Sequence, residues 1–275
     1  MQFGTIASGS SGNCLYAGDT DSHLLIDAGI SGKRICCGLS SFGVAPEAID
    51  GILVTHEHID HISGLGVMMR KFGCKVYATE GTIHEILKSK SLGKLPQNCF
   101  EAVKPQKKFK IGRIEVEPFR ISHDAKEPVS YVLRSGQQKI GMVTDLGYYD
   151  DYTVECLKNS DVLYIEANHD IKMLQVGPYP YYLKQRILGN RGHLCNEMAG
   201  RLIKELMNDK LKKVILGHLS KENNFPELAL ETVRLETGLY EGAQLSMFEP
   251  QRNEGLQSED ILVAPRDCAS ELIAI

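Results

Sequence analysis

The sequence lacks a strong excess of either charge. Its 275 residues carry 31 Lys and Arg against 35 Asp and Glu, which gives a formal net charge of -4. The protein as a whole therefore exerts no attraction on nucleic acid or on an anionic membrane. Binding of a polyanion has to come from a local patch or from a bound metal.

Long apolar stretches are also missing. No window approaches the roughly 18 apolar residues that cross a bilayer. The N-terminal residues MQFGTIASGSSGN have neither the basic start nor the apolar stretch of a signal peptide. We therefore expect a cytoplasmic protein with no membrane partner.

The eight cysteines do not form a framework. They occur as one adjacent pair, Cys36 and Cys37, and as scattered singles, with no C-x-x-C. This usage is typical of a reducing compartment. No linker, low-complexity tract or long charge block divides the chain, and 43% hydrophobic residues suffice for a large core, so we expect one domain over residues 1–275.

Short apolar runs predict a β-rich α/β fold. Strands are expected at 23–28, 51–55, 75–79, 113–119, 129–134, 139–145, 161–167, 212–218 and 260–266, and helices at 64–72, 80–90, 151–159 and 196–208. Strands that are apolar on both faces need covering on both faces. Residues 100–145 look like consecutive strands, with RSGQQK as a hairpin turn, whereas the flanking parts alternate strand and helix. This order favours two mixed sheets packed together with helices outside over one doubly wound sheet.

Polar residues crowd into the segment VTHEHIDH, residues 54–61, directly after the apolar run GILV. On a turn leaving a strand, such side chains converge beyond the carboxyl end of that strand, where α/β folds bind ligands. His56 and His58 are two apart on an extended chain, so they point the same way and can share one cation. Asp60 and His61, entering the next helix, can reach a second cation beside the first.

Further metal-ligand types follow other expected strands. His123 lies in ISHDA, Asp145 ends KIGMVTD and His218 ends KKVILGH. A lone histidine is more often a core or surface residue than a ligand, and His23 and His84 are read in that way. Three independent ligands at strand ends favour a metal site, because each ion needs about three protein ligands.

The segments THEHIDH, ISHD, VTDLG and LGHLS, preceded by LLIDAG, together resemble the metallo-beta-lactamase superfamily of binuclear hydrolases over nearly the whole chain. The resemblance implies an αββα sandwich of two mixed β-sheets flanked by helices, with two divalent metal ions. It assigns His56, His58 and His123 to one ion. It assigns Asp60, His61 and His218 to the other, with Asp145 bridging both. Asp27 is implied to orient the histidine loop. Zinc, manganese and iron all suit this mixture of ligands.

Such a centre performs hydrolysis without a Ser or Cys nucleophile. Two bridged cations lower the pKa of a bound water enough to give hydroxide near neutral pH, and they stabilise the anionic transition state of a phosphodiester. Asp60 is a candidate to orient the nucleophile or to handle its proton. His193 is a candidate for the acid that protonates the leaving oxygen.

Three further segments, IASGSSGNCLYAG, IEANHD and ILGNRGHLCN, resemble the WalJ (YycJ) branch of that superfamily, over about residues 3–265. Members of this branch are associated with exonuclease action on DNA, so the resemblance implies a DNA exonuclease with DNA as its substrate. It does not indicate protein partners. Ile59 and Cys195 depart from the serines that relatives often carry. Two alternatives stay open: a hydrolase of a small ester, thioester or cyclic phosphodiester, and a metal-binding or nucleic-acid-binding module without catalysis.

Candidate substrate contacts lie in three loops. Ser10 and Asn13 belong to SGSSGN, which is either a phosphate-binding nest or a plain turn. Arg191 and Asn196, like His193, lie in a loop that feeds a helix N-terminus, a common anion site.

Asn168 and His169 follow the expected strand 161–167, where they either contact substrate or cap a helix. The basic segment 104–113 is a candidate nucleic-acid contact or a solvated loop. The segment YPYYLKQR, residues 179–186, mixes tyrosines and cations as base-stacking surfaces do, although its tyrosines can equally pack onto the sheet.

Overall fold

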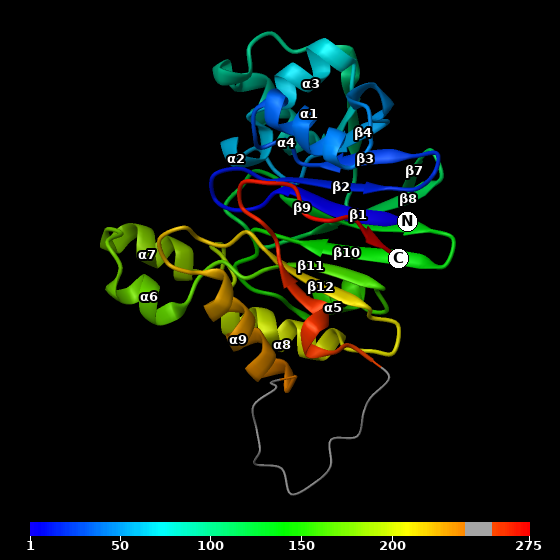
Figure 1. The fold of residues 1–275 in the computed structure, drawn as a ribbon. Helices are drawn as coiled ribbons and strands as arrows, with labels where there is room; N and C mark the ends of the chain where they lie inside the picture. The colour runs from blue at the N-terminus through cyan, green and yellow to red at the C-terminus, as the bar shows by residue number, and fades with distance from the viewer. Residues whose placement is uncertain (240–254) are drawn as a thin grey trace, which may run out of the picture.

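The structure is a computed structural model that describes residues 1–239 and 255–275. In these residues the strands form two seven-stranded mixed sheets (Figure 1). The first sheet contains, in spatial order, β14 (Ile273–Ala274), β1 (Gln2–Ala7), β2 (Cys14–Gly18), β3 (His23–Ile26), β4 (Gly51–Leu53), β5 (Val76–Thr79) and β6 (Phe100–Val103). The second contains β13 (Ile261–Val263), β12 (Lys213–Gly217), β11 (Val162–Glu166), β10 (Gln138–Val143), β9 (Val129–Ser135), β8 (Ile114–Arg120) and β7 (Phe109–Ile111).

Helices lie outside the two sheets. The first sheet is covered by α1 (Gly32–Ser41), α3 (Leu65–Phe72) and α4 (Glu80–Lys88), and the second by α5 (Asp151–Leu157), α8 (Asn196–Leu206) and α9 (Pro226–Thr237) (Figure 1). Three further helices stand toward the left of that view: α2 (Ile59–Ile62), α6 (Ile171–Val176) and α7 (Tyr181–Leu188). None of the helices in the described ranges is long and apolar enough to cross a membrane.

Three apolar layers hold the sandwich together. The layer between the sheets includes Phe3 of β1 and Tyr164 of β11, whose ring centroids are 6.1 Å apart. Ile35 of α1 packs in the layer outside the first sheet, and Leu202 of α8 in the layer outside the second. Burial on both faces of each sheet explains the continuous apolar runs of the central strands. The expected αββα sandwich is confirmed.

The elements predicted from apolar runs all occur, within a few residues of their expected ends. The RSGQQK hairpin is also confirmed, because Ser135 pairs with Gln138 across a two-residue turn in which Gly136 has a φ of 59°. β6 and β7 fall within residues 100–145, where consecutive strands were expected. Several other elements were not predicted, namely β1, β2, β14, α1, α6, α7 and α9.

The strand directions position one rim of the sandwich. β3 and β4 run parallel in the first sheet, and β10, β11 and β12 run parallel in the second. The carboxyl ends of parallel strands meet at the same edge of a sheet. The ends of these five strands, together with the loop after β8, carry the histidines and carboxylates described next.

Candidate metal centre

Three histidines converge on one point. The loop after β4 brings Nε2 of His56 to 3.0 Å from Nδ1 of His58. Nε2 of His123, from the loop after β8, lies 3.2 Å from the same Nδ1 atom. His56 and His123 are buried and His58 is partly buried. Three imidazole nitrogens at this separation can surround a single cation.

A second group lies beside the first. Oδ2 of Asp60, in α2, is 3.6 Å from Nε2 of His61 and 3.6 Å from Nε2 of His218, which follows β12. Asp145, just beyond β10, lies between the groups: its Oδ2 is 3.2 Å from Nε2 of His61, and its Oδ1 is 3.7 Å from Nε2 of His123. The structure therefore brings together all seven residues that the sequence assigned to metal.

Three residues of this site have left-handed backbone conformations. Asp27, Asp145 and His218 have φ angles of 61°, 57° and 54°. They make up three of the five non-glycine residues with positive φ in the described part of the chain. Such conformations are costly for residues other than glycine and concentrate at functional sites. Each follows a strand that runs toward the rim, β3, β10 or β12.

Asp27 connects the histidine loop to β3. Its carboxylate accepts hydrogen bonds from the backbone N–H of Thr55 at 2.8 Å and from Oγ1 of Thr55 at 2.9 Å. Its Oδ2 is also 2.7 Å from Nδ1 of His61. A proton on that Nδ1 leaves Nε2 of His61 free to face a cation, which is the usual effect of a carboxylate behind a ligand histidine.

Glu166 at the end of β11 has the same relation to two histidines and was not predicted. Its Oε1 is 2.7 Å from Nδ1 of His193 and 2.9 Å from Nδ1 of His218. Its Oε2 accepts from the backbone N–H of Leu146 at 2.8 Å and of Leu194 at 3.2 Å. Burial raises the pKa of this carboxyl, but the neighbouring His193 and His218 outweigh it and hold the pKa at about 2. The sequence signal was a single acid in the apolar run VLYIEA, residues 162–167.

The protonation of the histidines fits a cation site. Burial lowers the pKa of His56 well below its usual range and also lowers that of His123, so both are neutral. Burial acts in the same direction on His61 and His218, but there Asp145 and the adjoining carboxylates outweigh it and raise both pKa values, that of His218 to about 10. Nε2 of His218 is buried without a hydrogen-bond partner. A divalent metal ion suits these features. Neutral imidazoles can bind it, and its charge balances the buried carboxylates. Nε2 of His218 would gain a partner in it.

His193 borders the centre. Its ring centroid is 5.3 Å from those of His123 and His218, and its side chain is 19% exposed. Nδ1 of His193 lies 3.7 Å from Oδ1 of Asp145. The residue is therefore beside the metal-ligand groups and accessible from solvent.

Two of the predicted substrate contacts point inward instead. Asn168 is buried and donates from Nδ2 to the backbone oxygen of His218 at 2.9 Å. Asn196 is fully buried, and its side-chain amide exchanges hydrogen bonds with that of Asn224 at 2.8 and 3.1 Å. Both amides hold loops of the rim together, which corrects the expectation that they face a ligand.

The other predicted contacts differ in accessibility. Asn13 is buried, accepts from Gly9 N–H at 2.9 Å and has its Nδ2 3.2 Å from Nε2 of His61, whereas Ser10 is exposed. Arg191 is exposed and donates from Nε and Nη2 to the backbone oxygen of His123 at 3.1 and 3.0 Å.

His169 does not cap a helix. It is buried with neither ring nitrogen hydrogen-bonded, and burial lowers its pKa to about 4. Asp170 caps α6 by accepting from the Met173 N–H at 2.7 Å. Cys195, one of the two noted departures, pairs with His169 in an isolated bridge and is buried.

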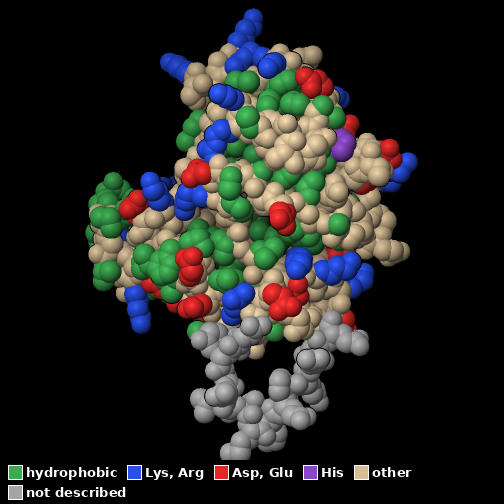
Figure 2. Space-filling model, viewed as in Figure 1, with side chains coloured by type: hydrophobic (Ala, Val, Ile, Leu, Met, Phe, Trp, Pro, Cys, Tyr) green, Lys and Arg blue, Asp and Glu red, His purple; other side chains and the backbone are tan. Residues whose placement is uncertain are grey.

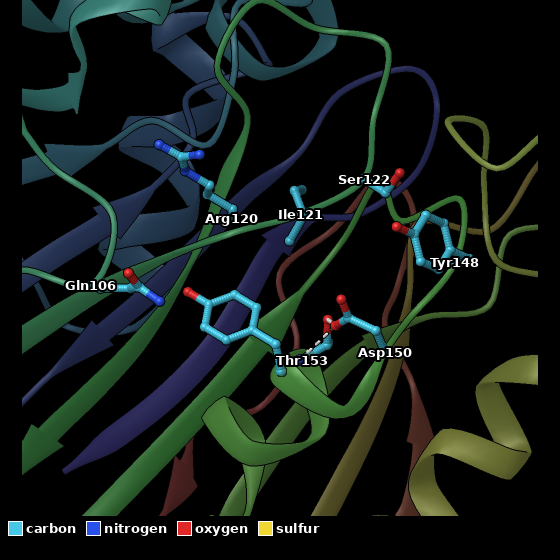
Figure 3. Close-up of a pocket in the computed structure, with 8 residues that line it drawn as sticks. Gln106, Arg120, Ile121, Ser122, Tyr148, Asp150 and Thr153 are labelled. Atoms are coloured by element: carbon cyan, nitrogen blue, oxygen red, sulfur yellow. Dashed lines mark hydrogen bonds between the residues drawn. The ribbon is translucent and has the colours of Figure 1, made fainter.

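A polar pocket adjoins the site. One of its lining residues, Ser122, directly precedes His123 in the chain. The others include Gln106, Arg120, Tyr148 and Tyr152 (Figure 3). The basic segment 104–113 contributes only Gln106 to this lining, and two of its cations are paired: Lys108 with Glu115 at 3.0 Å and Arg113 with Asp21 at 2.8 Å.

Comparison with known proteins identifies the family of this chain. The model of the beta-lactamase superfamily domain matches residues 22–219. The exodeoxyribonuclease WalJ of Streptococcus pneumoniae is 42% identical over 233 residues, which cover 85% of this chain and 87% of that protein. The exodeoxyribonuclease YycJ of Bacillus anthracis is 41% identical over 235 residues, 85% of this chain and 88% of that protein. The chain therefore belongs to the metallo-beta-lactamase superfamily, in the branch that contains WalJ and YycJ.

Solved structures share the fold. Zinc-bound PqqB from Methylobacterium extorquens superposes with a TM-score of 0.70 over 98% of this chain and 100% of that chain, at 13% identity. The short form of human tRNase Z superposes with a TM-score of 0.65 over 100% of this chain and 99% of that chain, at 16% identity. At such low identity these likenesses establish the fold alone.

We expect Asp27→Asn to weaken metal binding. Asn tolerates the left-handed conformation of residue 27. Its amide, however, cannot accept from both Thr55 and His61, so it opposes the tautomer that leaves Nε2 of His61 free. The affinity for zinc or manganese should fall about 10- to 100-fold, measured by titration against a chromophoric chelator.

The matched control is Asp50→Asn, which alters an exposed carboxylate that also accepts a backbone N–H, from His23 at 2.8 Å, but lies outside the site. It should bind metal like the unaltered protein. Equal affinity in the folded Asp27→Asn variant would contradict the orienting role.

Proposed function

We propose that the protein is a cytoplasmic, metal-dependent phosphodiester hydrolase that degrades DNA from an end. The strongest support is its identity of 41 to 42% with exodeoxyribonucleases over most of both chains, combined with a centre in which one buried carboxylate lies between two ligand groups. The free state of all eight cysteines suits a reducing compartment.

We assign two divalent ions, of zinc, manganese or iron, to the two groups. His56, His58 and His123 would hold one, and Asp60, His61 and His218 the other, with Asp145 contacting both. When bound, the ions would supply an activated water and neutralise charge on the phosphodiester oxygens. Asp60 is the most exposed carboxylate of the set, at 23%, so it can also accept a hydrogen bond from that water.

His193 is the proposed acid for the leaving oxygen, and Glu166 is its positioning residue. Because the pKa of Glu166 is about 2, the carboxylate stays ionised and accepts from Nδ1 of His193. The hydrogen bond fixes the ring so that Nε2 is the atom that gives up a proton. The buried Glu166 thus holds a partly exposed histidine, His193, whose other ring nitrogen can give a proton to a substrate.

The direct test is digestion of end-labelled single-stranded and double-stranded DNA. Metal-stripped protein reloaded with manganese or zinc should remove nucleotides stepwise, and Asp60→Ala should abolish this activity while Asp50→Ala preserves it. Absence of digestion in a protein shown to hold two ions would contradict the proposal and favour hydrolysis of a small ester, thioester or cyclic phosphodiester.

The role of His193 can be separated from that of the metal ligands. His193→Ala should lower kcat on DNA by a factor on the order of 100 or more, with the metal content unchanged. Hydrolysis of bis(p-nitrophenyl) phosphate should fall much less, because p-nitrophenolate leaves without protonation.

Glu166→Gln should give the same difference between the two substrates in weaker form, together with weaker metal binding, because Glu166 also holds His218. The exposed residue 84 supplies a control in His84→Ala, which should change nothing. An equal loss on both substrates in His193→Ala would show that His193 is not the acid.

A further inference from the structure

We propose that the α6–α7 arm, defined as residues 171–192, binds the unpaired end of the DNA strand that enters the metal centre, by stacking its bases on exposed tyrosines. This inference rests on the proposed function and adds to it the surface that guides the substrate. The arm holds helices α6 and α7 and stands away from the two sheets at the left of the molecule (Figure 1).

The arm has almost no core of its own. α7 contains no buried residue, and α6 buries only Leu174. Its apolar side chains face solvent: Val176 is 86% exposed, Tyr181 76% and Tyr182 75%. Figure 2 shows hydrophobic side chains gathered over this protrusion. Tyr181 and Tyr182 therefore do not pack onto a sheet, which was the other interpretation of this segment.

The charge of the arm is complementary to a phosphate backbone. Residues 171–192 contain four cations, Lys172, Lys184, Arg186 and Arg191, and none of the 35 acidic residues of the chain. In a protein with a net charge of -4, this is a local basic segment of the kind that polyanion binding requires. Adjacent tyrosines among cations form the surface on which single-stranded bases stack.

The arm is continuous with the metal centre. Arg186 of α7 forms an ion pair with Asp124, whose Oδ1 lies 3.4 Å from Nε2 of His123. The backbone oxygen of Ile187 accepts from the N–H of His193 at 3.0 Å. A strand lying on α7 is therefore directed to the ligands of the first group and to the proposed acid.

These features favour a nucleic-acid strand over a small ester as the occupant. A small substrate needs only the rim of the sandwich, whereas bases stacked on Tyr181 and Tyr182 extend away from the reacting phosphate. Unpaired bases are required, because the faces of paired bases inside a duplex are already stacked on their neighbours.

The test uses the double variant Tyr181→Ser with Tyr182→Ser. Anisotropy of a short labelled single-stranded oligonucleotide should show binding weakened about 10- to 100-fold, and kcat/KM on DNA should fall to a similar degree. Hydrolysis of bis(p-nitrophenyl) phosphate should be unchanged. The control is Leu235→Ser, which alters an apolar residue that is 61% exposed on a different helix, α9, and should leave all three measurements unchanged.

Unaltered oligonucleotide binding in the double variant would overturn the inference. An equal loss of activity on bis(p-nitrophenyl) phosphate and on DNA would also overturn it, because the substitutions would then disturb the metal centre and not a DNA contact. A dimer in sedimentation that the double variant dissociates, without an effect on DNA binding, would show instead that a second copy covers the arm.

The binding measurement also separates this inference from the proposed function. If the unaltered protein binds the oligonucleotide through the tyrosines but does not digest DNA, the arm assignment stands and the exonuclease proposal fails. If it digests DNA and the double variant binds equally well, only the arm assignment fails.

Discussion

A buried carboxylate between two groups of histidines governs this site. Asp145 is 2% exposed, and a charged group in such a position is stable only beside opposite charge. In the metal-free protein, protons on His61 and His218 supply that charge, as their raised pKa values show. Divalent ions would supply it in their place, so metal binding would release protons and would be favoured as the pH rises. The neutral state of His56 and His123 follows from the same burial.

The backbone conformation also positions the metal-ligand residues. Asp27, Asp145 and His218 each adopt a left-handed conformation, at a cost on the order of 1–3 kcal/mol per residue. The parallel strands and three apolar layers stabilise the molecule against that cost. Asp27 and Glu166 then fix the far nitrogens of His61 and His218, so each ring presents Nε2 to the centre. The residues at the strand ends therefore hold the metal-ligand side chains in fixed positions.

The metal-ligand residues could be located from the sequence because residues of that type follow several separate apolar strands, which single core or surface histidines do not do. Glu166 could not be found in this way, since its role depends on Nδ1 atoms of two histidines from separate loops. Asn168 and Asn196 were misjudged because a polar residue at a loop end looks the same in sequence whether it faces inward or outward. β1, β2 and α1 were missed because Gly and Ser interrupt their apolar patterns, as in GKRICCGLSS.

The central claim is that Asp145 lies between two divalent ions. Diffraction at the absorption edge of manganese or zinc, from crystals of the metal-loaded protein, tests it most directly. The account predicts two anomalous peaks about 3.5–4 Å apart, one among His56, His58 and His123 and the other among Asp60, His61 and His218, with Asp145 in contact with both. A single peak at saturating metal, or peaks that leave Asp145 without a metal contact, would contradict it.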